Sequence, residues 1–327
     1  MLKLIRLLFS GFTLLLIGIV IFATLFPING SSAILLDQIT TFAIVLLFFM
    51  HGAKLSRSAI IAGITHWRLH SLIFIFTFGI FPLIGFITLP FIKPLIGFSL
   101  AVGVLFLCTL PSTVQSAIAF TSIARGNVPA AICNASASSI IGIVLTPLIF
   151  SLMVETHSNG SQPLLTPIIE ISEKLLLPFL IGHLMRPLIG SFIENHTKLV
   201  YFVDQTSIPL IVYSAFNESV INGIWHQIPM KSLFILTVIC SVLLAIVLTA
   251  TTWLARYFHF NKEDEITIVF CGSKKSLASG VPIAQVMFWG SSSTIAIGPI
   301  LLPIMIFHQI QLMICYALAE HYAARFE

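Results

Sequence analysis

Two adjacent lysines lie inside an apolar stretch in the C-terminal third of the chain. Residues Cys271–Pro282 read C-G-S-K-K-S-L-A-S-G-V-P, with I-T-I-V-F before them and I-A-Q-V-M-F-W after them. A lysine at the centre of a membrane-spanning helix costs about 2.5–3.5 kcal/mol, so Lys274 and Lys275 together cost roughly 5–7 kcal/mol. A charge retained at this cost pairs with an anionic solute, carries a proton, or bonds backbone carbonyls that a break in the helix leaves free.

A second polar interruption occurs half a chain earlier. F-L-C-T-L-P-S-T-V-Q-S-A (Phe106–Ala117) and V-F-C-G-S-K-K-S-L-A (Val269–Ala278) both run from apolar residues through a cysteine into a Ser-bounded polar cluster. Irregular backbone is tolerated at membrane depth only where protein or a water-filled cavity satisfies it. The pattern therefore predicts two broken helices, interrupted at Pro111 and Gly272 and buried in a helix bundle.

The composition places both interruptions in an integral membrane protein. Of 327 residues, 57% are hydrophobic and 9% are charged, whereas soluble chains carry about 25% charged residues. A spanning helix needs roughly 20 apolar residues. We therefore expect an all-α membrane protein with ten transmembrane helices, at residues 7–27, 35–53, 67–89, 96–124, 128–154, 164–188, 200–222, 231–256, 263–289 and 293–320.

The matched interruptions and the distribution of basic residues predict how these helices are arranged. With five spans on each side of the midpoint, we expect residues 1–160 to form one five-helix repeat and residues 161–327 a second, inverted one. Eleven basic residues fall on the N-terminal side of the membrane, and the other side carries Lys93 and Lys231. This bias predicts both termini in the cytoplasm, at a plasma membrane or bacterial inner membrane. The basic residues are scattered between apolar segments, so no nucleic-acid partner is indicated.

Further polar side chains occur inside the apolar segments. In A-A-I-C-N-A-S-A-S-S, Asn134 and Ser138 share a helix face at i, i+4, and F-H-Q-I-Q places His308 and Gln309 in the last span. Serines within spans often serve only close helix packing, and that reading suits the A-S-A-S-S run equally well. A single intramembrane histidine is more often a hydrogen-bonded structural group than a proton carrier.

Other patterns favour structural interpretations. The five cysteines all fall in apolar segments without a C-x-x-C spacing, so we expect no disulfide. Asn261 followed by Asp264 and Glu265 predicts an N-cap with an acidic first turn. His66 and His70 share a helix face, but a metal site would need further ligands. No cofactor is indicated.

Two other classes of function remain open from the residues alone. Ser273 beside Lys274 is similar to a Ser–Lys nucleophile pair, which would suit an intramembrane enzyme. Adjacent residues seldom align for that geometry, and no oxyanion donor is identifiable. A non-transporting membrane sensor is the third reading, although the chain offers no long soluble domain as an output surface.

Several motifs together resemble the bile acid:sodium symporter superfamily, over essentially the whole chain. They are A-R-G-N-V (Ala124–Val128) after the broken fourth span, L-T-P-L (Leu145–Leu148) closing the fifth, the interrupted ninth span, and the His308–Gln309 pair. The resemblance implies a panel domain of helices 1, 2, 6 and 7 and a core domain of helices 3–5 and 8–10. It also implies that the broken helices 4 and 9 cross at their breaks, with sodium bound behind the crossing.

Carried over residue by residue, the resemblance gives a candidate ion site, or a site in which lysine replaces the ion. Its members are Thr77, Ser112, Thr113, Gln115, Ser116, Asn134, Ser138, Ser273, Lys274, Lys275 and Ser276. The sequence departs from the family pattern because Ile266–Ala284 contains no acidic residue. A hard cation usually has a carboxylate among its oxygen ligands. A lysine ammonium could instead occupy the sodium volume, as the S-x-K-S-L sequence of one branch of the family suggests.

These observations predict a secondary active transporter of an organic, anionic solute that works by panel and core movement. The coupling ion is sodium, or a lysine replaces the sodium site, and proton coupling through the lysine is the other option. Lys274, Lys275, His308 and Gln309 are the expected substrate-binding residues. The small solute and the lipid bilayer are the expected partners.

Overall fold

All regular secondary structure in the described residues is helical. The computed structural model describes residues 11–54, 66–155, 172–221, 223, 228–288 and 296–326. The elements are α2 (Gly11–Leu25), α3 (Ser31–Lys54), α5 (Trp67–Ile75), the π-helix η1 (Phe76–Ile80), α6 (Phe81–Ile96), α7 (Phe98–Thr109), α8 (Val114–Ile123), α9 (Val128–Glu155), the π-helix η2 (Ser172–Leu176), α11 (Leu177–Asn195), α12 (Thr197–Ile221), α14 (Met230–Tyr257), α15 (Lys262–Gly272), α16 (Leu277–Phe288), α17 (Ile297–Ala323) and the short 3₁₀ turn η3 (Ala324–Phe326).

Six helices in the described part of the chain are long and apolar enough to cross a membrane. They cover Ser31–Lys54, Trp67–Ile96, Val128–Val154, Glu173–Ile193, Met230–Tyr257 and Ile297–Ala323. The bent pair α7 and α8 would add a seventh span. The expected all-α, multi-pass membrane protein is confirmed at this level, while the count of ten spans and the inverted repeat remain predictions.

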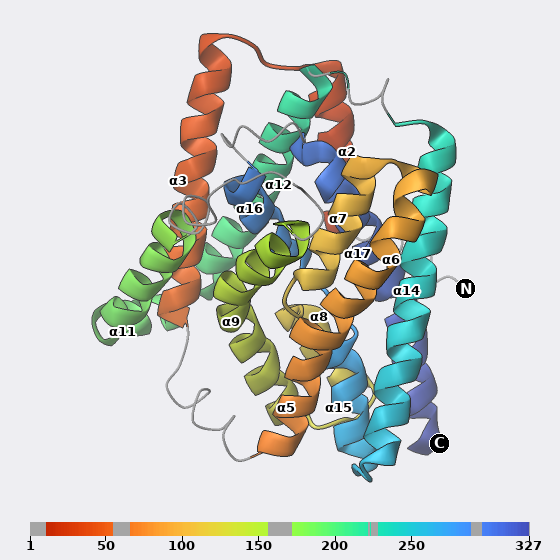
Figure 1. Cartoon of the computed structure of the whole chain (residues 1–327). Coiled ribbons are helices and arrows are strands. Elements are labelled where there is room, and N and C mark those ends of the chain that lie inside the picture. Colours follow the sequence, from red (N-terminus) through yellow and green to blue (C-terminus); the bar gives the residue numbers. More distant parts are fainter. Residues whose placement is uncertain are drawn as a thin grey trace.

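Both predicted interruptions are present as irregular stretches between two shorter helices. Residues 110–113 separate α7 from α8, which are bent by 61° relative to each other, and residues 273–276 separate α15 from α16. In the view of Figure 1, α7 and α16 lie in the upper half of the molecule, and α8 and α15 lie in the lower half. Proline explains the first break, because Pro111 has no N–H to continue the helix.

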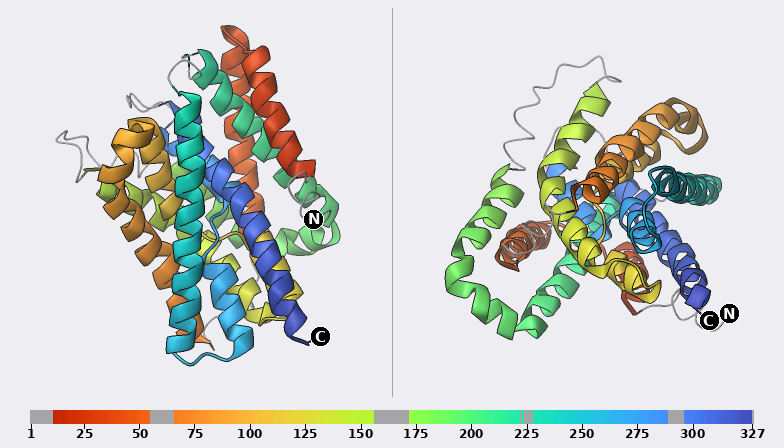
Figure 2. Two further views of the ribbon diagram at one scale, coloured as in Figure 1. Left: turned by 90° about the vertical axis from the view of Figure 1, so that its right-hand side faces the viewer. Right: turned by 90° about the horizontal axis from the view of Figure 1, so that it is seen from below.

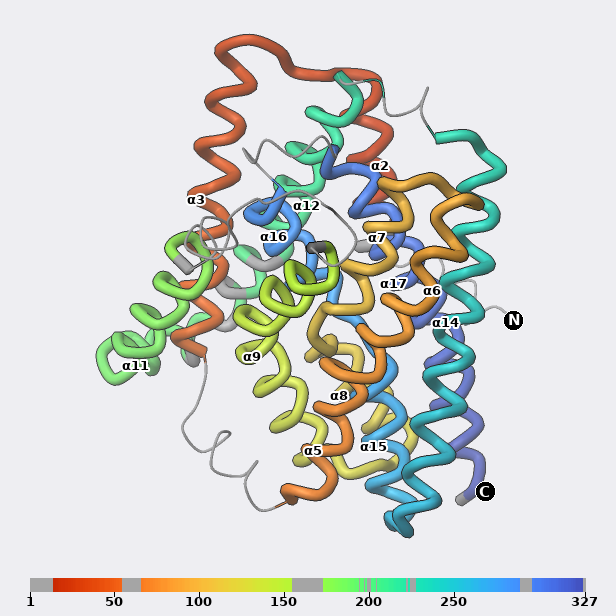
Figure 3. Tube along the Cα trace, in the orientation of Figure 1, coloured from red at the N-terminus to blue at the C-terminus, as the bar shows by residue number. Residues whose placement is uncertain are grey.

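The helices fall into groups that pack closely among themselves. Helix α3 packs against α11 and α12, and α12 also packs against α2. Helix α7 packs against α6 and α17, whereas α14 lies against α15 and α17. Figure 1 shows α3 and α11 at one side of the bundle and α14 at the other, and the chain can be followed between them in Figure 3. The second view of Figure 2 shows α7, α14, α15 and α17 grouped away from α11.

The end of the bundle near residue 262 is held by a hydrogen-bonded network. Asn261 caps α15 by accepting from the Asp264 N–H at 2.8 Å, which confirms the predicted N-cap. Glu265 accepts from Lys262 at 2.7 Å and from the Tyr322 hydroxyl at 3.2 Å, so its carboxylate joins α15 to α17. Asn127 of the A-R-G-N-V turn donates to Asp264 at 2.8 Å and ties this turn to the same end.

Helices α3 and α11 approach each other through two glycines. A Cβ on Gly52 would collide with the backbone carbonyl of Phe179, and a Cβ on Gly182 would collide with that of Phe49. Small residues permit such close contact between membrane helices, where packing drives association in place of water exclusion. The pair therefore fixes the position of α11 on α3.

We expect Gly52→Ala and Gly182→Ala each to destabilise the protein by about 1–3 kcal/mol, because a rigid backbone group on the facing helix must move. Gly18→Ala in α2 is the matched control, since a Cβ there meets nothing within 4 Å. Thermal unfolding of the purified protein in lipid nanodiscs measures the difference. Equal unfolding temperatures for all three variants would contradict the close packing of α3 and α11.

Candidate functional site

The two breaks are hydrogen-bonded directly to each other. The Ser112 hydroxyl donates to the Cys271 carbonyl at 2.7 Å, and the Thr113 hydroxyl donates to the Lys275 carbonyl at 2.9 Å. In the other direction, the Ser276 N–H donates to the Pro111 carbonyl at 2.9 Å. All of these groups are buried, so each bond satisfies a polar group that water does not reach.

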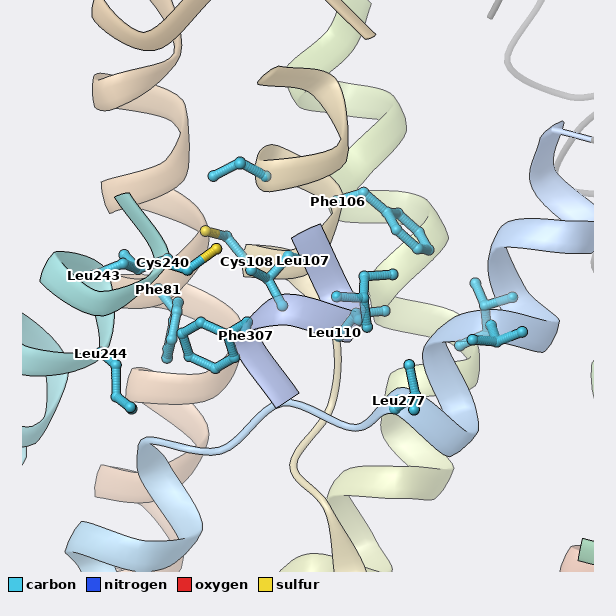
Figure 4. Close-up of a cluster of buried hydrophobic side chains, with 14 of the residues drawn as sticks. Phe81, Phe106, Leu107, Cys108, Leu110, Cys240, Leu243, Leu244, Leu277 and Phe307 are labelled. Carbon is cyan, nitrogen blue, oxygen red and sulfur yellow. The ribbon is translucent and has the colours of Figure 1, made fainter. Parts of the chain in front are cut away.

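Apolar side chains enclose this crossing. Figure 4 shows Leu110 and Leu277 beside the irregular stretches, with Phe81 and Phe307 on the other side of the crossing. The rings of Phe81 and Phe307 meet edge to face, with centroids 6.1 Å apart. The crossing is therefore a polar spot within the main hydrophobic core.

The backbone carbonyls from 107 to 111, where α7 ends, can be accounted for one by one. Leu107 accepts from the Leu110 N–H, Thr109 accepts from the Thr146 hydroxyl, and Pro111 accepts from Ser276. The two remaining carbonyls, of Cys108 and Leu110, have no backbone donor. Both accept from the side chain of Lys275, so the first break is satisfied only with this lysine in place.

The Lys275 ammonium uses all three of its donors on backbone carbonyls. Its Nζ lies 2.8 Å from the Thr77 oxygen, 2.7 Å from that of Cys108 and 2.8 Å from that of Leu110. The Phe81 ring lies against the same ammonium, 4.2 Å from its centroid. Lysine carries three N–H donors, so this group is fully hydrogen-bonded although the residue is 1% exposed.

The Thr77 carbonyl has no backbone donor, and the local backbone explains why. In η1 the bonds run from residue i+5 to residue i, and the Phe81 N–H accordingly bonds the Phe76 carbonyl. The corresponding donor for Thr77 would be residue 82, which is Pro82 and has no N–H. The π-segment and the proline together leave one carbonyl aimed at the lysine. The sequence predicted Thr77 as a site residue through its side chain, whereas the structure uses its backbone.

Gln311 of α17 also holds the second break, and its role was not predicted. Its Oε1 accepts from the Lys275 N–H at 3.0 Å, and its Nε2 donates to the Lys275 carbonyl at 2.9 Å. The same Nε2 lies 3.0 Å from Nδ1 of His308. The only sequence signal was a glutamine within an apolar segment, which does not reveal what it contacts.

The Lys274 ammonium is in a different situation. Its one hydrogen bond is a long one of 3.4 Å to the Ser116 hydroxyl. The Phe120 ring lies under the ammonium at 3.7 Å from the centroid, and the Phe270 ring lies at 6.0 Å. Lys274 is 0% exposed, and among the described residues no second hydrogen-bond acceptor is bound to its ammonium. Of the two lysines, this one has hydrogen-bonding capacity left for a ligand or a proton acceptor.

The crossing does not fit a sodium ion in this arrangement. The carbonyls that converge are already bonded to the Lys275 ammonium, and the hydroxyls of Ser112 and Thr113 donate to other carbonyls. Neither Lys274 nor Lys275 has a carboxylate partner among the described residues. Hard cations require oxygen ligands and charge balance, and a fixed ammonium removes both.

The remaining predicted residues are divided between the crossing and its surroundings. Ser138 accepts from the Ser112 N–H at 3.0 Å and therefore belongs to the crossing. The Asn134 Nδ2 lies 3.2 Å from Nδ1 of His70, and its Oδ1 is buried and has no hydrogen-bond partner. Gln115 is exposed on α8, so its amide is not part of the crossing.

Two further observations concern the other readings of the sequence. The Ser273 hydroxyl donates to the Val269 carbonyl at 2.6 Å, so it bonds its own helix and forms no pair with Lys274. Ser276 contacts Ser279 through their hydroxyls and accepts from the Ser279 N–H. All five cysteines are buried, and none of them forms a disulfide. Among the described residues, no group of three His, Cys, Asp or Glu side chains could hold a metal ion.

Comparison with known proteins identifies the family. The model of the SBF-like CPA transporter family matches residues 10–324. An uncharacterized protein of Pseudomonas aeruginosa, PA2026, is 53% identical over 320 residues, which are 98% of this chain and 95% of that protein. YfeH of Escherichia coli K12, whose name designates it a candidate symporter, is 52% identical over 326 residues, 99% of this chain and 96% of YfeH. The mouse protein named sodium/bile acid cotransporter 7 is 28% identical over 274 residues, 83% of this chain and 79% of its own length.

These matches agree with the motifs around the two breaks. The family and the names of the relatives indicate a membrane transporter and not an enzyme, which leaves the Ser273–Lys274 reading without support. They also confirm the resemblance to the bile acid:sodium symporters that A-R-G-N-V and the interrupted ninth segment suggested. The family match covers almost the whole chain, and this protein belongs to the SBF-like CPA transporter family.

Proposed function

We propose that this protein is a secondary active transporter of an organic, anionic solute in which the Lys275 ammonium takes the place of a coupling sodium ion. The observation that carries the proposal is the set of three carbonyl oxygens, each within 2.8 Å of Lys275 Nζ. These oxygens come from the π-segment and from the break after α7, the region where the resemblance puts the ion. An ammonium there satisfies the same oxygens that a cation would.

The resemblance suggests a division into two moving parts, which meet where α12 packs against α16 and α17 and where Ser219 accepts from the Gly298 N–H at 2.8 Å. Helices α2, α3, α11 and α12 would form the panel, and α5 to α9 with α14 to α17 the core. The glycine contact between α3 and α11 and the hydrogen bonds between the two breaks lie within one part each, so the parts could shift without breaking them. We place both termini in the cytoplasm, at the plasma membrane, on the basis of the basic residues.

Lys274 is the candidate for the group that binds the solute or exchanges a proton during transport. Its ammonium has one long hydrogen bond and is otherwise held by the Phe120 ring. The Gln311 amide next to His308 keeps the histidine side chain near the crossing. Lys274 and His308 would meet the acidic group of a solute, or exchange a proton, in a conformation that opens this side of the core. The role of Gln309 in binding the solute stays a prediction.

Replacing Lys275 should lower the stability of the protein, whereas replacing Lys274 should not. Lys275→Met leaves three buried carbonyls without a donor, and we expect a loss of about 3 kcal/mol or more. Lys274→Met has nearly the same length but removes an ammonium with one weak bond, so we expect an unchanged or higher stability. Thermal unfolding in nanodiscs compares the two variants directly, since the mutated positions are adjacent. A larger loss for Lys274→Met would contradict the assignment of Lys275 as the bound cation.

Wild-type stability should be independent of sodium. With Lys275 in the ion position, replacing choline chloride by sodium chloride at constant ionic strength should not shift the thermal unfolding midpoint. A relative of the same superfamily that carries a glutamate in the ninth helix is the positive control and should be stabilised. A saturable sodium-dependent rise in this protein would show that sodium binds and would overturn the replacement.

A further inference from the structure

A small cavity with polar and apolar lining lies between α3, η2 and α16, at a distance from the crossing. It has a volume of about 20 Å³, and its polar lining consists of Asp37, Thr40, Thr41, Lys174 and Gln285. This is enough room for one group of the size of a water molecule. Gln285 follows the break residue Ser276 by roughly 13 Å along α16, so the cavity is separate from the lysine site.

The cavity contains hydrogen-bonding atoms that the protein does not satisfy. Gln285 Oε1 and Thr40 Oγ1 are buried without a partner, and their residues are 3% and 1% exposed. A buried acceptor without a donor costs about 1–3 kcal/mol, so such groups usually have a ligand or an ordered water. An amide oxygen can only accept, and the missing group must therefore carry N–H or O–H donors.

The charged side chains that line the cavity indicate which chemical groups its ligand carries. Asp37 of α3 adds a carboxylate beside these acceptors, and Glu218 of α12 lies near enough to interact with Asp37 electrostatically. Three acceptors with a carboxylate among them suit a protonated amine, which has three donors and a positive charge. Lys174 of η2 adds an ammonium to the same lining, and an ammonium suits a carboxylate or another acidic group.

We propose that this cavity is the recognition site for a zwitterionic solute, an organic acid that also carries a protonated amine. In the described conformation the amine would lie on Asp37, Thr40 and Gln285 and the acidic group on Lys174, so this contact differs from the one proposed with Lys274 and His308 in an opened conformation. This inference rests on the proposed function, because the cavity lies between the helices assigned to the panel and to the core. Their movement would widen the cavity to admit the rest of the solute, of which the described conformation has room for the ammonium alone.

The test is ligand-dependent thermal unfolding of the full chain in nanodiscs. The zwitterions β-alanine and γ-aminobutyrate are compared with acids that lack the amine, propionate and butyrate, and with amines that lack the acid, ethylamine and propylamine. We expect a saturable rise of about 4 °C for at least one zwitterion and a smaller rise for its matched acid and amine. Asp37→Asn, Thr40→Val and Gln285→Leu should each abolish this rise.

Thr88→Val is the control for loss of a hydroxyl, because Thr88 bonds the Ile84 carbonyl of its own helix, away from the cavity. It should keep the full response to the zwitterion. Because the three variants lie on two helices, the test can still be read if one of them fails to fold. No saturable rise with either zwitterion, an equal rise with the matched acid or amine, or a rise that survives all three substitutions would overturn the proposal.

Uptake into proteoliposomes separates this inference from the function on which it rests. Radiolabelled γ-aminobutyrate and β-alanine are the probes, and wild type is compared with Gln285→Leu. Uptake that Gln285→Leu abolishes supports both the site and the transport function. Saturable binding without uptake would contradict transport and keep the site, whereas uptake that is equal in the two proteins would overturn the site and keep transport.

Discussion

The hydrogen bonds of the Lys275 ammonium are the interaction on which the centre of this protein depends. A helix broken inside a membrane protein exposes carbonyls that no water can satisfy, and each one must find a donor within the protein. Here the carbonyls of Thr77, Cys108 and Leu110 find that donor in a single side chain. Pro82, five residues after Thr77, the break after α7 and the lysine of the second break are therefore joined through this one group.

An ammonium that is part of a side chain differs from a bound ion because it cannot be released from the site. Sodium leaves its site when the protein opens, and this release couples solute movement to the ion gradient. Lys275 cannot leave, and it can change its charge only by losing a proton. Its three bonds to carbonyl oxygens use all three donors of the ammonium. In the proposed mechanism the fixed cation would maintain the crossing through the transport cycle, and exchange with solution would fall to other groups, of which Lys274 is the nearest.

The sequence predicted those parts of the structure that follow from local pattern. The two breaks, the cap at Asn261 and the apolar helices were all readable, because proline, hydroxyl residues and hydropathy act over a few positions. It could not distinguish Lys274 from Lys275, since adjacent side chains leave the backbone in different directions and the direction depends on the irregular turn. The use of the Thr77 carbonyl and the double bond of Gln311 could not be predicted either, because both depend on which helix lies opposite.

The second half of the broken ninth segment connects the two sites. Helix α16 begins directly after the lysine break, where Ser276 bonds Pro111 and the Ser279 N–H, and it carries Gln285 into the cavity beside α3. If a helix of this length moves as a rigid element, a solute that binds Gln285 in the proposed site would also displace the crossing. The first end is held by bonds between the two breaks. Near the second end, Gln285 Oε1 has no hydrogen-bond partner, and the Phe288 ring packs against Phe106 and Phe150. In the proposed mechanism, α16 is therefore the element through which solute binding at Gln285 would reach the core.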